Sequence, residues 1–470
     1  MMAGLTKTIL SIFISATLSV VAVSSIQKPW TEPTLASDWH IETVDSPGDV
    51  GRGSSLELDS NGNPHISYLD YINWDLKYAK WDGSAWTVEI VDSVGEVGMF
   101  ASMALDSSDY PHISYYDITN HNLKYARWTG SIWSIVTVDN ASRVGWSTSI
   151  ALDSFDCPHI SYGAKFKLKY ARWTGSIWSI VTVDNAGNVG WDTSIAIDSS
   201  DYPHISYAEY DPNYDLKYAK WTGSSWSIET VDTRMNEWTS IALNSNGYPH
   251  ISYKAFGLRH AEWTGSSWNI EIVDSDDMAG GTSSIALDGG DHPHISYFAG
   301  FPNDDLKYAE WTGSSWNIEI VDSEDEVGVF TSLTLDSVDH PHISYFDDTH
   351  RDLKYAKKGE PGSPQRSVAL NIDPDTLNLK SKGKWITAYL TTENTTPDSI
   401  DASYLLLNDV VSPSWWDVQD NVTLMVKFNR AAVQAIVPVS DSVDIKITGQ
   451  WKDGENFELH DTIRVINPGR

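Results

Sequence analysis

Short stretches of alternating apolar and polar residues, separated by turn-forming residues, recur along most of this chain. In the segment 158–162, Pro-His-Ile-Ser-Tyr, the polar His and Ser alternate with the apolar Ile and Tyr. Successive side chains of a strand point to opposite faces of a sheet, so this pattern predicts β-strands. The links between the stretches, such as Asp-Ser-Phe-Asp-Cys-Pro from Asp153 and Thr-Gly-Ser from Thr174, are rich in residues that favour tight turns.

The Pro-His-Ile-Ser-Tyr stretch occurs seven times, at intervals of 44 to 48 residues. The copies begin at Pro64, Pro111, Pro158, Pro203, Pro249, Pro293 and Pro341. Each copy divides into four predicted strands, which in the third copy span 149–153, 159–162, 168–173 and 178–184. A period of this length made of short strands is typical of a β-propeller, in which each repeat forms one four-stranded blade.

The seventh copy lacks a fourth strand, because the chain runs from Tyr355 directly into Lys358-Gly359. The missing strand has a counterpart at the other end of the chain, where Trp-His-Ile-Glu-Thr-Val-Asp from Trp39 matches 86–92 and 316–322. We therefore expect the N-terminal strand to complete the last blade. On these repeats the segment 37–358 resembles seven-bladed β-propellers of exported microbial proteins. It lacks the Gly-His and Trp-Asp signature of WD40 repeats and the Asp box of sialidases.

A Gly-, Pro- and charge-rich linker at 359–366 indicates a domain boundary. Beyond it, residues 367–470 contain alternating stretches such as 385–390 and 422–428, which predict a small Ig-like β-sandwich. The segment Asn-Ile-Asp-Pro-Asp-Thr-Leu-Asn-Leu-Lys at 371–380 resembles the opening of a C-terminal module of exported microbial multidomain proteins. That resemblance implies attachment or spacing more than catalysis.

The first 25 residues have the pattern of a signal peptide. Lys7 precedes an apolar run from Ile9 to Val23, which closes on Ser24 and Ser25. An uncleaved anchor is the alternative, and no later stretch approaches the roughly 20 apolar residues of a membrane helix. We expect a secreted or cell-surface protein with signal peptide 1–25 and no transmembrane segment after cleavage.

The chain is strongly acidic, with 64 acidic and 32 basic residues and a formal net charge of −32. Such a surface repels phosphate backbones, so nucleic acid and anionic lipid are poor candidate partners, and we expect no nucleic acid partner. We see no nucleophile elbow, phosphate loop or metal cluster, and we expect no cofactor. The Asp-rich turns could bind calcium weakly, but the EF-hand pattern is missing, so turn formation is the better interpretation.

Three sets of residues recur in all or nearly all copies, which suits a scaffold. The repeated His residues would lie too far apart to share one metal ion, so we expect each to hydrogen-bond within its blade to the nearby Ser and to the next strand. The cation of Leu-Lys-Tyr and the Asp that closes the fourth strand are expected to pair across one hairpin. The Trp pairs are expected to pack between blades, with repeated sugar pockets as the alternative.

Variation between the copies collects in the second and fourth links, which emerge on the same face of an up-and-down blade. Binding residues favour such loops on a rigid scaffold. We predict ligand-binding residues near the central channel on this face. The alternative is that the aromatic side chains among them only plug the mouth of the channel. The predicted residues are Arg52, Phe100, Trp146, Trp191, Trp238, Phe330, Arg143 and Arg351, with Asp192, Arg234, Glu237 and Asp348 as nearby charges.

Aromatic faces beside a few charges are the composition that recognises carbohydrate or peptide. We therefore expect an exported, lectin-like, non-catalytic scaffold that binds a glycan or an extracellular protein. One alternative is a polysaccharide-active hydrolase or lyase, and another is a structural surface-layer or adhesion component. A carboxylate pair in the funnel with one raised pKa would favour the enzyme, whereas equivalent pockets between blades would favour the lectin.

Overall fold

The computed structural model describes residues 39–467, except 212–213, 234–236, 277, 325, 360–366, 394, 409 and 453–455. The predicted signal peptide, most of the predicted linker and Arg234 lie outside the described residues. The described elements are nearly all β-strands, together with α1 (Arg430–Ile436) and the short 3-10 turn η1 (Pro397–Ser399). The predicted all-β fold class is confirmed.

Seven four-stranded antiparallel sheets form the propeller. Blades 1 to 3 consist of β2 (Val50–Leu58), β3 (Pro64–Asp70), β4 (Asp75–Trp81) and β5 (Trp86–Asp92); β6 (Met99–Leu105), β7 (Pro111–Asp117), β8 (Asn122–Trp128) and β9 (Trp133–Asp139); and β10 (Val144–Leu152), β11 (Pro158–Ala164), β12 (Leu168–Trp173) and β13 (Trp178–Asp184). Blades 4 to 6 consist of β14 (Asn188–Ile197), β15 (Pro203–Asp211), β16 (Asp215–Trp221) and β17 (Trp226–Asp232); β18 (Glu237–Leu243), β19 (Pro249–Lys254), β20 (Leu258–Trp263) and β21 (Trp268–Asp274); and β22 (Ala279–Leu287), β23 (Pro293–Ala299), β24 (Asp305–Trp311) and β25 (Trp316–Asp322). Blade 7 consists of β26 (Val327–Leu335), β27 (Pro341–Asp347), β28 (Asp352–Lys358) and β1 (Trp39–Asp45).

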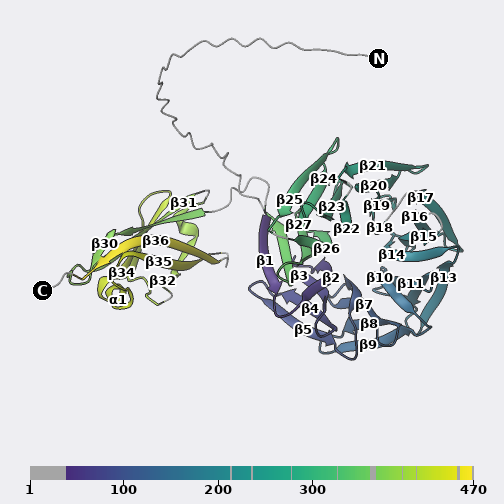
Figure 1. The fold of residues 1–470 in the computed structure, drawn as a ribbon, viewed down its shortest axis with the longest axis horizontal. Helices are drawn as coiled ribbons and strands as arrows, with labels where there is room; N and C mark the ends of the chain where they lie inside the picture. The colour runs from purple at the N-terminus through teal and green to yellow at the C-terminus, as the bar shows by residue number, and fades with distance from the viewer. Residues whose placement is uncertain are drawn as a thin grey trace, which may run out of the picture. The chain divides into compact units, whose positions relative to one another are not determined.

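The N-terminal strand closes the ring, as predicted. β1 pairs antiparallel with β28, and Trp39 lies opposite Lys358. Figure 1 shows the blades around a central axis, with β14, β18 and β22 toward the centre and β17, β21 and β25 at the rim. Because neighbouring strands within each blade are antiparallel, the second and fourth links leave from one face, which we call the variable face.

The apolar core lies between the blades rather than within them. The Pro-His-Ile-Ser-Tyr strands carry it, and β3, β7, β11 and β27 are buried at all seven positions. One cluster joins Leu76 and Tyr78 of blade 1 to Met103, Ile113 and Tyr115 of blade 2. Aromatic rings fill the outer part of these wedges. The predicted packing of the second Trp of each pair is confirmed.

The Trp contacts show how this wedge is filled. The ring of Trp133 in blade 2 lies edge-on to Tyr78 of blade 1, with the ring centroids 5.4 Å apart. Trp86 in blade 1 makes the same contact with Tyr355 of blade 7, at 5.5 Å. The first Trp of each hairpin packs on the second, as Trp81 does on Trp86 at 5.7 Å. Each junction therefore covers part of one large ring that a blade alone would leave exposed.

The repeated Lys and Asp residues pair between blades, which corrects the prediction of pairing across one hairpin. Lys124 of blade 2 donates to Asp92, which closes blade 1, and the hydroxyl of Tyr115 donates to the same carboxylate at 2.7 Å. The register shift between β8 and β9 explains the difference, because it places Asp139 opposite Leu123, on the other face from Lys124. The Asp that closes each blade is thus held by the following blade.

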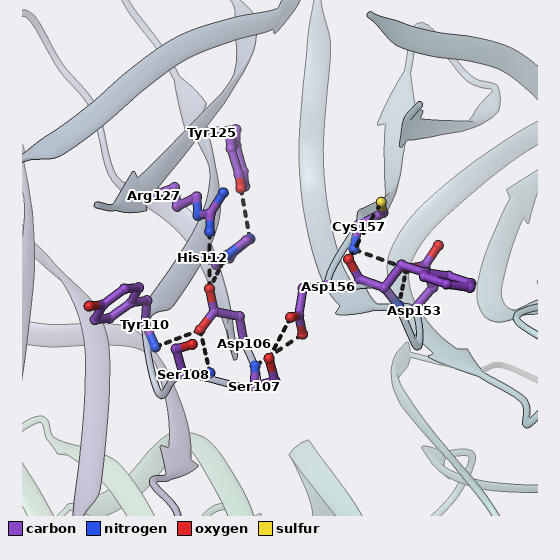
Figure 2. A network of polar contacts seen from close by, with 11 residues as sticks. Asp106, Ser107, Ser108, Tyr110, His112, Tyr125, Arg127, Asp153, Asp156 and Cys157 are labelled. Atoms are coloured by element: carbon purple, nitrogen blue, oxygen red, sulfur yellow. Dashed lines mark hydrogen bonds and ion pairs between the residues drawn. The ribbon is translucent and has the colours of Figure 1, made fainter. Parts of the chain in front are cut away.

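The repeated His residues are bonded inside their own blades, as predicted, but their partner is not the nearby Ser. His112 Nδ1 lies 2.7 Å from the hydroxyl of Tyr125, and Nε2 lies 3.3 Å from Asp106 (Figure 2). Burial lowers the pKa of His112 to about 4. Ser114 instead accepts a hydrogen bond from Thr148 of the next blade, at 2.8 Å. The His residues are therefore structural and neutral near pH 7.

The C-terminal domain is the predicted β-sandwich. One sheet has the order β29 (Ser367–Asp373), β31 (Trp385–Glu393), β34 (Thr423–Asn429), β33 (Trp415–Val418), and the other has the order β30 (Thr376–Asn378), β36 (Asn456–Ile466), β35 (Ser440–Trp451), β32 (Ile400–Leu407). Buried residues such as Leu390, Phe428, Ile445 and Val465 form one core. The domain thus has a core of its own.

Candidate functional site

The first strand of each blade begins with a bulge. In β10 the pairing with β11 shifts twice between Val144 and Ser149. The structure therefore starts this strand at Val144, five residues before the predicted start. At seven equivalent positions one residue per blade takes a left-handed backbone, with φ between 45° and 60°: Gly53, Phe100, Ser147, Asp192, Trp238, Thr282 and Phe330. Any residue other than Gly loses roughly 1–2 kcal/mol in this conformation.

These bulges line a single cavity of about 280 Å³, which we call the funnel. All seven blades contribute, so the funnel lies on the propeller axis, at the ends of the inner strands that meet the variable face. Its first ring consists of the bulge residues. Its second ring consists of the next residue of each strand, Ser54, Ala101, Thr148, Thr193, Thr239, Ser283 and Thr331. The funnel therefore combines four aromatic side chains, the bulge residues Phe100, Trp238 and Phe330 together with Tyr71, with a ring of hydroxyl groups.

The aromatic side chains approach one another across the axis. Trp238 of blade 5 and Phe330 of blade 7 have ring centroids 6.4 Å apart and meet edge to face. Phe330 also packs on Phe346 at 6.5 Å. The backbone around them is held by polar contacts, since the amide of Phe330 donates to Thr282 Oγ1 at 3.0 Å. The rings are thus fixed by neighbouring blades.

Arg52 lies at the rim with its charge already balanced. Its guanidinium stacks between Tyr71 and Phe346, each 4.7 Å from the ring centroid. It donates to Asp49 at 2.8 and 3.2 Å, and this bonding raises the pKa of Arg52 above its usual value. Asp348 lies 3.7 Å away and also bonds Arg351, at 2.7 Å. The cluster forms a rigid rim rather than a free cationic site.

Asp192 is the only acidic residue among the described residues that line the funnel. Its Oδ2 accepts a hydrogen bond from the hydroxyl of Tyr210 at 2.8 Å and another from the amide of Trp238 at 3.4 Å. Burial raises the pKa of this carboxyl, the bond from Tyr210 opposes the rise, and the charge of Glu237 adds to it. Asp192 is therefore the one acidic group among the described residues that breaks the symmetry of the funnel.

The predicted site residues fall into three groups. Phe100, Trp238, Phe330 and Arg52 line the funnel, and Arg351 stays on the rim bonded to Asp348. A separate cavity of about 40 Å³ is lined by Trp146, Trp191 and Arg143. The sequence-based prediction had treated two successive positions of the repeat as if they were one equivalent position.

Trp146 and Trp191 precede the bulge residues Ser147 and Asp192 by one position. At this position the side chain lines the separate cavity in blades 3 and 4, whereas Arg52 and Met99, which occupy it in blades 1 and 2, line the funnel. Sequence reasoning also missed the second ring, although every copy carries Ser, Thr or Ala at that position. That recurrence was the signal that could have found it.

On the face of the propeller opposite the variable face, the Asp-rich turns hydrogen-bond within themselves and to the next blade. Asp106 Oδ1 accepts from the amides of Ser108 and Tyr110, each at 2.9 Å (Figure 2). Ser107 donates through its amide and its hydroxyl to Asp156 of the next blade, at 3.0 and 2.6 Å. The interpretation of these residues as turn formers is confirmed. In the described part of the chain no group of three or more His, Cys, Asp or Glu is placed to hold a metal ion.

No protein-family model matches the sequence, and no curated protein matches it. Among solved structures, an ulvan lyase from a new family of polysaccharide lyase aligns with a TM-score of 0.51 and 15% identity, over 67% of this chain and 95% of that chain. At this identity the likeness is one of fold. The chain is a β-propeller repeat protein.

Two fungal proteins align less closely. The lectin of Aleuria aurantia, a six-bladed β-propeller that recognises fucose, has a TM-score of 0.40 and 14% identity over 57% of this chain and 95% of its own. AofleA from Arthrobotrys oligospora has a TM-score of 0.43 and 11% identity over 60% and 89%. Across the described elements of the propeller and the sandwich, no helix is long and apolar enough to cross a membrane.

Proposed function

We propose that this protein is an exported, non-catalytic scaffold that binds a glycan through the funnel. The observation that supports this proposal most directly is that Phe100, Trp238 and Phe330 line the same cavity as the ring of Ser and Thr hydroxyls. A sugar ring has an apolar face that stacks on aromatic side chains, and its hydroxyls exchange hydrogen bonds with polar ones. Both kinds of group line one cavity.

The charge and the volume of the funnel limit which ligands it can bind. The charge of Arg52 is balanced by Asp49, so the funnel offers no free cation to an anionic sugar. The pKa of Asp192, its one acidic lining residue among those described, is raised. The volume of about 280 Å³ is at the lower end of small-molecule sites. An uncharged sugar unit at the end of a chain fits these properties best.

Backbone strain at the aromatic bulges supports a functional role. Phe100, Trp238 and Phe330 have φ values of 56°, 52° and 56°. Bulky residues seldom occupy this region, and such strain persists where the surrounding structure enforces it, often at binding sites. Gly53 at the equivalent position of blade 1 shows that the fold itself accepts a residue without strain.

The test is a glycan array with the full chain, with and without calcium, repeated with Trp238→Ala. The matched control is Trp415→Ala, which removes an exposed Trp of the sandwich. Binding that only Trp238→Ala abolishes supports the proposal. Binding of an uncharged glycan that survives Trp238→Ala, or an array with no bound uncharged glycan, rejects it and favours a protein partner or a structural surface component.

A second candidate is a polysaccharide-active hydrolase or lyase, favoured by Asp192. A buried carboxyl with a raised pKa beside a second acid, Glu237, can act as a general acid or base. Any glycan that binds is incubated with the protein, and new reducing ends and unsaturated products are measured. Cleavage that Asp192→Asn abolishes would establish the enzyme, whereas intact glycan after prolonged incubation supports the non-catalytic scaffold.

Export is part of the proposal and rests on Lys7 and the apolar run that follows it. Secretion or surface display would place the funnel among extracellular glycans. N-terminal sequencing of the protein recovered from a secreting host tests this. A mature chain that begins near Ser25 supports export, and retention of Met1 in a soluble cellular fraction contradicts it.

A further inference from the structure

The smaller cavity, which we call the side pocket, lies between blades 3 and 4 on the variable face. It has a volume of about 40 Å³, and its lining includes Arg143, Trp146, Lys165, Phe166 and Trp191. Arg143 lies on the link between blades 2 and 3, Lys165 lies on the second link of blade 3, and the tryptophans come from β10 and β14. None of these residues lines the funnel.

The side pocket carries a local positive charge on an acidic protein. Arg143, Lys165 and the adjacent Lys167 are exposed. None of the three has an ion-pair partner among the residues that the structure describes. Most other cations of the described propeller are ion-paired, as Lys217 is with Glu209 at 3.3 Å. In a chain of net charge −32, three unpaired cations in one place are unusual.

The second link of blade 3 explains this local charge. It reads Ala-Lys-Phe-Lys from Ala164, whereas the same link of blade 1 is bounded by Asp70 and Asp75. In blade 7 it is bounded by Asp347 and Asp352. The link of blade 3 therefore carries two lysines and no acid, which makes the local potential favour an anion.

Aromatic rings form a wall beside these cations. The ring centroids of Trp146 and Trp191 lie 5.3 Å apart. Trp146 also packs on Tyr116 at 6.2 Å, and Trp191 packs on Tyr210 at 5.3 Å. The indole of Trp191 is oriented by a hydrogen bond to Asn188 at 2.7 Å. Four rings from three blades are thus held in place before any ligand arrives, which lowers the entropic cost of binding.

The turn that presents Lys165 and Phe166 is strained. Ala164 and Lys167 exchange backbone hydrogen bonds at 2.9 and 3.1 Å, and φ is 46° at Lys165 and 64° at Phe166. A two-residue turn with both φ values positive normally takes Asn-Gly. Here it projects a cation and a ring that is 61% exposed. Side chains chosen for stability alone would not be expected in this turn.

We propose that the side pocket binds an anionic saccharide, with its carboxylate or sulfate group beside Arg143 and Lys165 and its ring against the exposed side chain of Phe166 and the half-buried tryptophans. A cavity of about 40 Å³ admits one substituent rather than a whole sugar. Guanidinium and ammonium groups bind such anions through charge-assisted hydrogen bonds. The ligand is distinct in charge from that proposed for the funnel, and the two sites are independent.

The test measures binding of three oligosaccharides to the full chain by calorimetry: chondroitin sulfate, desulfated chondroitin and neutral dextran. The variant is Arg143→Gln/Lys165→Gln. The control is Lys80→Gln/Lys220→Gln, which removes the same charge from side chains paired with Asp59 and Asp198. Melting curves establish that each variant is folded.

We expect chondroitin sulfate to bind, and the side-pocket variant to weaken it at least about tenfold, the effect of one charge-assisted hydrogen bond. The control variant and Trp238→Ala should bind as the unchanged protein does. Desulfated chondroitin that binds equally well identifies the carboxylate as the recognised group, and loss of its binding identifies the sulfate. No binding of either chondroitin, equal binding of dextran, or an unaffected side-pocket variant would overturn the proposal.

Discussion

Replacing Ala101 with Thr should stabilise the junction between blades 1 and 2. At the other six junctions, the Ser of Pro-His-Ile-Ser-Tyr shares a hydrogen bond with a hydroxyl of the second funnel ring, as Ser114 does with Thr148 at 2.8 Å. Ser67 has no such partner, because the facing residue is Ala101. Its hydroxyl is completely buried and unsatisfied.

The magnitude follows from the hydroxyl that is left without a partner. A buried unsatisfied hydroxyl costs roughly 1–3 kcal/mol, and a new neutral hydrogen bond returns about 1 kcal/mol of stability. Thr introduces little crowding, because position 101 lines the funnel and four of the equivalent positions already hold Thr. We expect the free energy of unfolding to rise by about 1 kcal/mol for Ala101→Thr.

Urea unfolding followed by tryptophan fluorescence measures the effect. The matched control is Ala101→Val, which has the shape of Thr without its hydroxyl. The difference between the Thr and Val variants isolates the hydrogen bond to Ser67. If Ala101→Val unfolds at the same urea concentration as Ala101→Thr, or at a higher one, the missing hydrogen bond does not limit this junction and the reasoning is wrong.

Three further outcomes test the scaffold. Asp92→Ala should lower the free energy of unfolding by about 2–4 kcal/mol, because it leaves the buried ammonium of Lys124 unpaired; thermal unfolding measures this. Gly98→Ala should cost well over ~1 kcal/mol, since its Cβ would lie 2.9 Å from backbone, whereas Gly83→Ala, at a similar φ but in open space, should cost only the strain in the same urea assay. Burial lowers the pKa of His112 to about 4, so the unfolded chain binds its proton first, and stability should fall as pH drops from about 6.5 to 4. Urea midpoints plotted against pH should fall less steeply for His112→Gln than for the unchanged protein, because the other repeated His residues still titrate.

The architecture could be derived from the sequence because it depends on local, repeated information. Alternation with period two identifies strands, and seven copies of one stretch count the blades. The sequence has an extra strand at Trp39 and lacks a fourth strand after Tyr355. Because the extra strand supplies the missing one, ring closure could also be predicted, and β1 does pair with β28. The face that carries the variable links followed from the antiparallel order of the strands.

The tertiary structure alone decided which residues meet. A bulge at the start of each inner strand shifts the side chains by one position, so Trp238 enters the funnel while Trp146 lies in the side pocket. A second bulge places Asp92 beside Lys124 of the next blade instead of Lys77 of its own. Alternation identifies a strand but does not reveal an extra residue inside it, because the bulge depends on pairing with a neighbouring strand and on packing between blades.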